Sequence, residues 1–123
     1  MIEHVPDFSH IKDGDACIYF LLEDNSRLKE TVSPRVKIGV TNRLDCTLKQ
    51  FRLQILRASS AEDFIVLHAI KAPSKEIARS LERRLHQRFA KARSAHSLEW
   101  FDLTEEEVAW CKSMTYEQLV RNS

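Results

Sequence analysis

The sequence predicts an α+β fold in which a three-stranded, mainly antiparallel sheet is flanked by helices. Two observations predict it. Three short segments have the β-branched and aromatic content of strands, and two longer segments carry apolar residues at helical spacing. A chain of 123 residues without a linker-like break in composition forms one domain, because two domains would both be undersized. We therefore expect a single domain over residues 1–123, with residues 1–14 and 115–123 peripheral.

Three segments are expected to form the strands of this sheet. Residues 16–22, ACIYFLL, are continuously apolar, which is typical of a strand buried on both faces. Residues 35–41, RVKIGVT, alternate between apolar residues on one side and Lys37 and Gly39 on the other. Residues 64–70, FIVLHAI, are short and rich in branched side chains. Antiparallel pairing of the first two strands through the loop between them is the simplest connection.

Capping residues mark where the helices should begin. Asn42 can cap a first helix that ends before residues 59–60, with Asp45 in its first turn. Ser74 is a good cap for the longest helix, whose apolar stripe runs to about Ala92. Two shorter helices should open at the capping pairs Thr104 with Glu107 and Thr115 with Gln118.

Composition excludes several classes of protein. The longest apolar run, residues 16–22, is far too short to span a membrane, and the acidic start lacks the features of a signal peptide. We therefore expect no membrane association and a cytoplasmic location. Three cysteines without metal-ligand spacing support neither a disulfide framework nor a zinc site, so we expect free thiols at Cys17, Cys46 and Cys111.

Charge is distributed unevenly along the chain. The formal net charge is only +1, but residues 27–93 hold 16 Lys and Arg against 6 Asp and Glu. The two flanks together hold 3 basic against 12 acidic residues. The middle of the chain is therefore a candidate for binding a polyanion such as nucleic acid. Alternatively, the acidic ends fold back and neutralise a solvated basic face.

Several short motifs follow one another in a fixed order. The first two expected strands carry Cys17-Ile18-Tyr19 and Lys37-Ile38-Gly39. Ser80-Leu81-Glu82 then runs into Leu85-His86-Gln87-Arg88-Phe89 on the long helix, and Glu99-Trp100-Phe101 follows it. This series resembles the GIY-YIG nuclease superfamily, in a phage and bacterial branch with VKIG, E-x-x-L-H-x-x-F and EWF motifs. The resemblance covers roughly residues 16–110.

The resemblance implies a metal-dependent endonuclease that hydrolyses phosphodiester bonds of DNA with one Mg²⁺ or Mn²⁺ ion. It implies a face on which two tyrosines, an arginine of the first helix and a glutamate of the later helix surround the scissile phosphate. These residue types suit the reaction. An oxygen nucleophile must be deprotonated and aimed while the developing negative charge is neutralised.

Tyr19 and Glu82 match two of these four groups. The resemblance implies that Tyr19 orients or deprotonates the attacking water and that Glu82 binds the metal. One carboxylate with waters and phosphate oxygens suits Mg²⁺. Both residues also have plainer interpretations. Tyr19 can be a buried tyrosine with a backbone partner, and Glu82 can be a surface glutamate paired with Arg79 or His86.

The other two groups depart from the family pattern. Lys37 stands where the second motif has tyrosine; on the same side as Tyr19 it would supply positive charge to phosphate, or it only solubilises the strand. Thr47 stands where the family carries its arginine, and it cannot neutralise charge. Arg43, about one turn earlier, begins near the edge of the sheet where the site should lie, so it is the expected substitute.

Three further features have both functional and plain interpretations. His86, one turn beyond Glu82, can carry protons or merely pack. Gly39 leaves room for the substrate or the first helix, or it marks a bend. We expect Trp100 and Phe101 to pack in the core. The basic side chains of the long helix can follow a nucleic-acid backbone or form a solvated face; they include Arg79, Arg83, Arg84 and Arg88.

Three functions follow from these features. The leading hypothesis is the DNA endonuclease, with DNA as its partner. The alternative is a catalytically impaired module that binds nucleic acid or a protein partner without cleavage, because of Thr47. A third hypothesis is a protein-interaction module that uses the acidic termini. No targeting domain is evident, so specificity would have to come from a partner or a homodimer.

Overall fold

The computed structural model describes residues 8–24, 34–58, 63–93 and 100–121. The first residues of the chain, the loop between the first two expected strands and Glu99 of the third motif lie outside these ranges.

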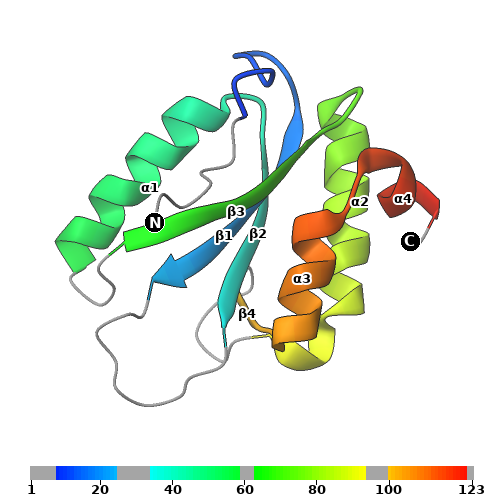
Figure 1. Cartoon of the computed structure of the whole chain (residues 1–123). Helices are drawn as coiled ribbons and strands as arrows, with labels where there is room; N and C mark the ends of the chain where they lie inside the picture. Colours follow the sequence, from blue (N-terminus) through cyan, green and yellow to red (C-terminus); the bar gives the residue numbers. More distant parts are fainter. Residues whose placement is uncertain (1–7, 25–33, 59–62, 94–99, 122–123) are drawn as a thin grey trace, which may run out of the picture.

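Among the described residues the sheet has four strands, and each strand is antiparallel to its neighbours (Figure 1). They are β1 (Cys17–Asp24), β2 (Arg35–Thr41), β3 (Asp63–Lys71) and β4 (Trp100–Asp102), in the order β3-β1-β2-β4. The first three confirm the expected strands. The fourth was not expected, because Trp100 and Phe101 were expected only to pack in the core; it adds three residues to the outer edge of β2.

Helices cover both faces of the sheet, so the molecule has three layers (Figure 1). The helix α1 (Leu44–Ala58) covers one face. The helices α2 (Lys75–Arg88), α3 (Glu105–Ser113) and α4 (Tyr116–Arg121) lie on the other. α2 ends four residues before the expected Ala92, because Phe89 leaves the helical conformation and the 3-10 turn η1 (Ala90–Ala92) follows it.

The helix starts agree with the capping residues at three of the four helices. The Ser74 hydroxyl accepts a hydrogen bond from the backbone N–H of Ile77 at 3.2 Å. Thr104 with Glu107 forms a reciprocal capping box, and Thr115 with Gln118 repeats the pattern.

The start of α1 differs from the expected cap at Asn42. The backbone carbonyl that accepts the first intrahelical hydrogen bond belongs to Arg43, and the N–H of Arg43 donates to the hydroxyl of Thr41 at 3.0 Å. Arg43 therefore occupies the N-cap position, one residue later than expected. The hydroxyl of Thr41, at the end of β2, supports this end of the helix.

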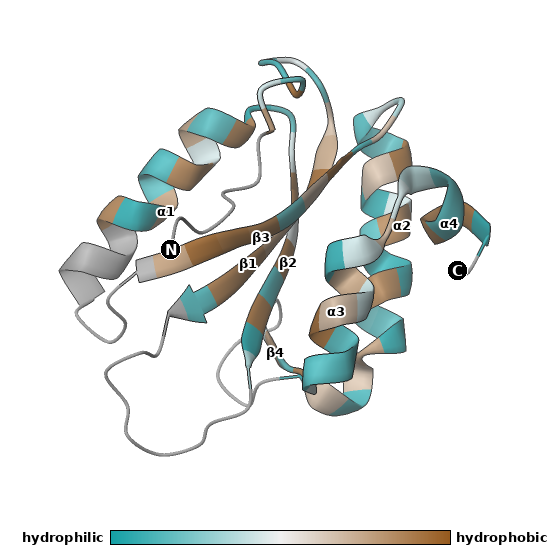
Figure 2. Ribbon diagram, viewed as in Figure 1, coloured by the Kyte–Doolittle hydropathy of each residue, from teal (hydrophilic) through white to brown (hydrophobic). Residues whose placement is uncertain are grey.

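Two apolar clusters lie on opposite sides of the sheet. The alternation along β1 sends Ile18 and Phe20 to the larger cluster, under α2, α3 and α4, and sends Tyr19 and Leu21 to the smaller cluster, under α1. Figure 2 shows the hydrophobic colour along β1 and β3, whereas the helices alternate between hydrophobic and hydrophilic residues. Each face of the central strands is thus buried, as the continuous apolar run of β1 predicts.

Candidate functional site

The ring of Tyr19 lies across the neighbouring strand β2. Tyr19 is paired with Gly39 in the antiparallel register, and a Cβ atom placed on Gly39 would clash with both Cζ and Oη of Tyr19. Only glycine allows this close approach. Gly39 therefore leaves room for the tyrosine ring. The sequence had suggested room for the substrate or for the first helix instead. The phenol is 6% exposed, and its hydroxyl end is carried over β2.

Lys37 extends over the same face of the sheet as Tyr19, as expected. Its Nζ lies 6.0 Å from the centre of the Tyr19 ring and 5.4 Å from the centre of the Phe51 ring on α1. The ammonium group is thus held between two aromatic rings by a favourable cation–π arrangement. A positive charge therefore lies close to the phenol at the centre of the sheet.

His86 joins α2 to β2 next to Gly39. Its Nε2 lies 3.0 Å from the backbone oxygen of Ile38. A carbonyl oxygen only accepts, so Nε2 carries the proton and donates it. The centre of the imidazole ring lies 5.1 Å from that of Phe101. His86 is thus fixed by packing and by a hydrogen bond, and only Nδ1 remains for proton transfer in the neutral ring.

Glu82 lies on the same side of α2 as His86, one turn nearer the start of the helix, and is half-buried. The start of α2 lies at the Thr41 end of β2, because Lys71 and Thr41 both pair with Cys17 and α2 begins four residues after Lys71. Glu82 therefore lies closer than His86 to the end of β2 at which α1 begins. This agrees with its expected place at the margin of the packed stripe.

Tyr19 and α2 thus approach the same short segment, Ile38-Gly39, from opposite faces of the sheet. The phenol lies over Gly39, and His86 binds Ile38. β4 pairs only with Arg35, Val36 and Lys37, so among the described residues no strand covers the outer edge of β2 at this segment. Tyr19 and Glu82 therefore lie on opposite faces of the sheet, and not on the single face that the resemblance implies. Among the described residues, Tyr19 and this part of α2 both adjoin the end of β2 that no strand covers.

Thr47 is bonded to the sheet and lies at the same end of β2. Its hydroxyl lies 2.8 Å from that of Thr41, which also accepts the N–H of Arg43. The position at which the resemblance implies an arginine is therefore occupied by a residue that attaches α1 to β2. Arg43, the expected substitute, stands at the junction of β2 and α1 with an exposed side chain.

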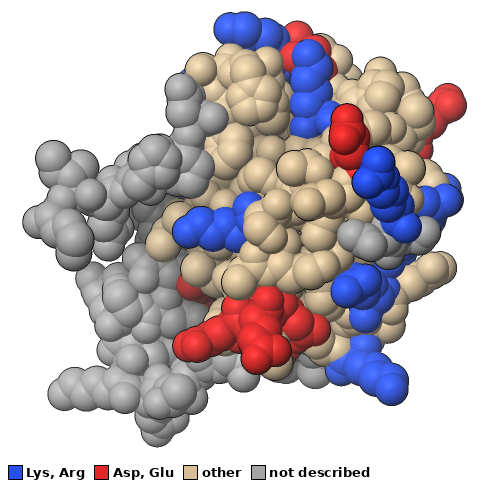
Figure 3. Space-filling model, turned by 45° about the vertical axis from the view of Figure 1, so that its right-hand side comes forward, with Lys and Arg blue, Asp and Glu red and all other residues tan. Residues whose placement is uncertain are grey.

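The basic residues of α2 are exposed, as expected for Arg79, Arg83 and Arg84. Arg88 is exposed as well, but its guanidinium lies 4.2 Å from the centre of the Trp110 ring and so helps to pack α2 against α3. Figure 3 shows basic side chains along the right-hand side, with single acidic side chains beside some of them, and a compact acidic group below the centre.

Described side chains offer no dense metal cluster. Among residues 8–24, 34–58, 63–93 and 100–121, no three His, Cys, Asp or Glu side chains gather as metal ligands. The half-buried carboxylate of Glu82 fits an ion such as Mg²⁺, which keeps several waters and needs few protein ligands. It does not fit a closed site for a structural metal.

The thiols of the chain are unsuited to a role as nucleophile. Burial raises the pKa of Cys17, beside Tyr19 on β1, to about 11, and raises that of Cys111 to about 12. Cys46 is half-buried, and all three cysteines are free, as expected.

Of the two aromatic residues expected in the core, Phe101 is fully buried and Trp100 is only half-buried. Sequence reasoning also missed Thr41 and Phe51. Thr41 ends the second expected strand just before the first expected helix, and this position could be seen in the sequence. Phe51 is one of the apolar residues at helical spacing in α1, and this spacing gives no sign of its contact with Lys37.

A search for membrane spans among the described helices found none of sufficient length and apolarity.

The described residues form a small α+β domain in which Tyr19 and α2 lie against one strand from opposite faces of the sheet. Comparison with family models identifies the family. The model of the T5orf172 domain matches residues 16–115, so the chain belongs to the T5orf172 domain family, a phage-related, nuclease-like domain. No curated protein and no solved structure matches the chain.

This match corrects the resemblance stated from the motifs. The matching family is the T5orf172 domain, and the assignment to the GIY-YIG superfamily is therefore wrong. The quoted motifs all fall within residues 16–115, so they are features of this T5orf172 chain. The roles of individual residues must then be argued from the geometry of this chain.

Proposed function

We propose that this domain is a metal-dependent endonuclease that hydrolyses phosphodiester bonds of DNA beside the Ile38-Gly39 segment of β2. One observation carries the proposal: the Tyr19 ring and the side of α2 that holds Glu82 and His86 approach this segment from opposite faces. Membership of a nuclease-like family and the net positive charge of residues 27–93 support it.

Hydrolysis of a phosphodiester needs an aimed nucleophile and compensation of negative charge. The Tyr19 hydroxyl accepts a hydrogen bond from the attacking water and aims it at phosphorus. The ammonium of Lys37, 6.0 Å from the Tyr19 ring, compensates charge on the phosphate. Arg43, at the end of β2, provides a second positive charge. Exposed arginines of α2 hold the flanking phosphates, and this attraction weakens as salt rises.

Glu82 would hold the divalent cation, either Mg²⁺ or Mn²⁺. When bound, such an ion neutralises charge on the phosphate oxygens and makes a coordinated water more acidic. His86 acts mainly as a positioning residue, because its hydrogen bond to the Ile38 carbonyl fixes this turn of α2 against β2. Nδ1 is the atom through which it can also carry a proton.

Nicking of a supercoiled plasmid with Mg²⁺ or Mn²⁺ tests the proposal. We expect Glu82→Gln and Tyr19→Phe to lower the rate by roughly a hundredfold or more, in the range found when one group that stabilises a transition state is removed. Glu76→Gln is the matched control, because Glu76 is an exposed acid in the first turn of the same helix. Absence of nicking by the purified wild type, or equal rates for Glu82→Gln and Glu76→Gln, would overturn it.

A second candidate function is binding of nucleic acid without cleavage. The specific observation in its favour is Thr47, which stands where α1 is attached to β2, with its hydroxyl 2.8 Å from that of Thr41, and which has no charge to offer a phosphate. This function predicts salt-dependent retention of DNA that survives Glu82→Gln, together with no nicking by the wild type. Loss of retention at low salt would exclude it. A protein partner or a homodimer remains the proposed source of specificity in either case.

A further inference from the structure

A row of three aromatic rings crosses the α1 face of the sheet beside the candidate site. The Phe51 ring of α1 lies at the centre of the row, 5.1 Å from the ring of Phe64 on β3 and 5.9 Å from that of Trp100 on β4. Phe64 is buried, whereas Phe51 and Trp100 are half-buried. The row therefore presents partly exposed aromatic surface at the β4 end.

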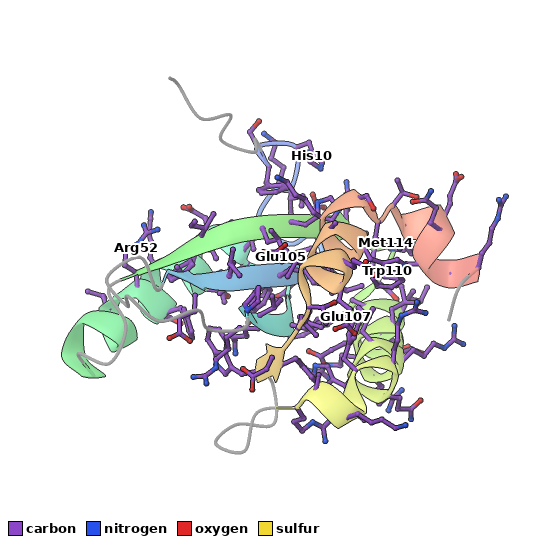
Figure 4. All side chains as sticks on the ribbon, turned by 60° about the horizontal axis from the view of Figure 1, so that its bottom comes forward. His10, Arg52, Glu105, Glu107, Trp110 and Met114 are labelled. Carbon is purple, nitrogen blue, oxygen red and sulfur yellow. The ribbon has the colours of Figure 1, made fainter. Side chains whose placement is uncertain are left out.

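Two cations accompany this aromatic row. Lys37 is paired with Trp100 in the sheet, and its Nζ lies 5.4 Å from the centre of the Phe51 ring. The guanidinium of Arg52 lies 5.1 Å from the centre of the Phe64 ring. Figure 4 shows Arg52 on α1, at the opposite end of the molecule from Trp110 and Met114. The cations and rings thus form one mixed surface on the α1 side.

Lys37 connects this surface to the proposed phosphate site, because it also lies over the Tyr19 ring. A nucleotide whose phosphate is at Tyr19 has its sugar and base within a few ångströms of that phosphate. Aromatic rings with nearby cations bind a nucleobase by stacking, and they do so only when the face of the base is available. A base inside a duplex is stacked on its neighbours and does not offer this face.

We propose that Trp100 and Phe51 stack an unpaired nucleobase next to the phosphate bound at Tyr19. The substrate class is therefore DNA with a single-stranded or unpaired segment, rather than uniform duplex. This inference rests on the proposed function, since it names the substrate of the same site, but it is tested by binding and not by cleavage.

Tryptophan fluorescence tests the stacking directly. The chain has two tryptophans, so Trp110→Phe leaves Trp100 as the only one. We titrate this full-length variant in EDTA with a single-stranded oligothymidylate of about twelve nucleotides, and separately with the same strand annealed to oligoadenylate. Trp100 emission should be quenched by the single strand at saturation and should change little with the duplex. Unchanged emission at saturation with the single strand would overturn the proposal.

Affinity measurements on variants provide a second, independent test. Trp100→Ala should weaken binding of the single strand by roughly five- to a hundredfold, the range for loss of one stacked base, and should change duplex affinity less than twofold. Trp100→Phe keeps an aromatic ring and should recover most of the affinity, which also controls for folding. Equal losses on both nucleic acids, or an Ala variant with wild-type affinity, would contradict stacking by Trp100.

The two proposals fail in distinguishable ways. If nicking is absent but the single-strand preference depends on Trp100, the endonuclease activity is wrong and the stacking surface is right. If nicking depends on Glu82 and Trp100 emission does not respond, the reverse holds.

Discussion

The two faces of the sheet are built for different purposes, although they share the same strands. On the face under α2, α3 and α4, β1 and β2 contribute Ile18, Phe20 and Ile38, all with no exposed surface. On the face under α1, the same strands contribute Tyr19 and Lys37. The first face is an apolar core, and the second combines a smaller core with polar groups and a positive charge.

The difference shows how a small domain can place most of its apolar packing on one face and put polar groups among the packing of the other. Because strand residues alternate between faces, each strand supplies the larger core with every second residue and the α1 face with the others. The larger core can then stabilise the fold while the α1 face carries Tyr19 and Lys37, whereas the proposed metal ligand Glu82 lies on α2 at the margin of the larger core. This separation makes predictions that can be tested one face at a time.

The largest expected effect comes from neighbouring residues of β4 that lie on opposite faces. Phe101 is fully buried in the larger core, so Phe101→Ala should lower the free energy of unfolding by about 3–5 kcal/mol. Trp100 is half-buried on the α1 face, so Trp100→Ala should lower the free energy of unfolding by clearly less. Urea denaturation followed by circular dichroism measures both. A larger loss for Trp100→Ala would show that the α1 face carries more of the stability than its burial indicates.

A smaller effect is expected at Gly39, where the α1 face is most crowded. In Gly39→Ala the new methyl group meets Cζ and Oη of Tyr19, so the ring must shift, at a cost of about 1–3 kcal/mol. The displaced phenol should also lower plasmid nicking. In a Tyr19→Leu background the same substitution should cost at least about 1 kcal/mol less, because the clashing atoms are gone. Additive losses in this double-mutant cycle would show that the ring is not what requires glycine.

Sequence patterns predicted the elements of both faces but not the contacts between them. The alternation in β2 and the apolar run of β1 are local signals, and they located the strands and put Tyr19 and Lys37 on one face. The three-residue strand β4 has no periodicity of its own, and it is defined only by its pairing with β2. Its pairing could not be predicted because it joins residues more than sixty positions apart.

Site residues show the same limit. The patterns placed Glu82 at the margin of the packed stripe, but the anchoring of this turn by His86 to Ile38 depends on how α2 crosses the sheet. The reason for Gly39 is likewise a side chain on another strand. The resemblance to the GIY-YIG superfamily rested on short motifs. The match of the T5orf172 family model to 100 residues of the chain corrected it.

Each face of the sheet has one buried thiol, so the stability of the protein at alkaline pH can be used to compare the two faces. Cys17, on the α1 face, has its pKa raised to about 11, and Cys111, in the larger core, to about 12, both mainly by burial. In the unfolded chain these thiols ionise near pH 9. Between pH 9 and the raised values only the unfolded state releases the protons, so stability present below pH 9 is lost as pH rises.

We expect a loss on the order of 1–2 kcal/mol per thiol by about pH 10.5. Urea midpoints at pH 8 and pH 10.5 measure it in the wild type and in Cys111→Ala, which should lose less between the two pH values. Cys46→Ser is the control for removing a thiol that is only half-buried. A profile of Cys111→Ala identical to that of the wild type would contradict protection of this thiol.

The smallest effect is expected at the start of α3, which packs on the side of the sheet opposite Tyr19. Thr104→Ala removes the hydroxyl that accepts the Glu107 N–H at 3.1 Å, and it should lower the free energy of unfolding by about 1 kcal/mol. Thr104→Ser keeps an accepting hydroxyl and should be close to the wild type. Thermal denaturation distinguishes the two variants.

The same variant also tests whether the faces act independently. Thr104→Ala loosens a helix that contributes to the larger core, and it touches none of the groups that surround Tyr19. If stability and chemistry are separated by the sheet, plasmid nicking and the response of Trp100 to single-stranded DNA should be unchanged at temperatures where the variant is folded. A change in either would mean that α3 positions β4 through the short segment between Asp102 and Thr104, and that the two faces are coupled there.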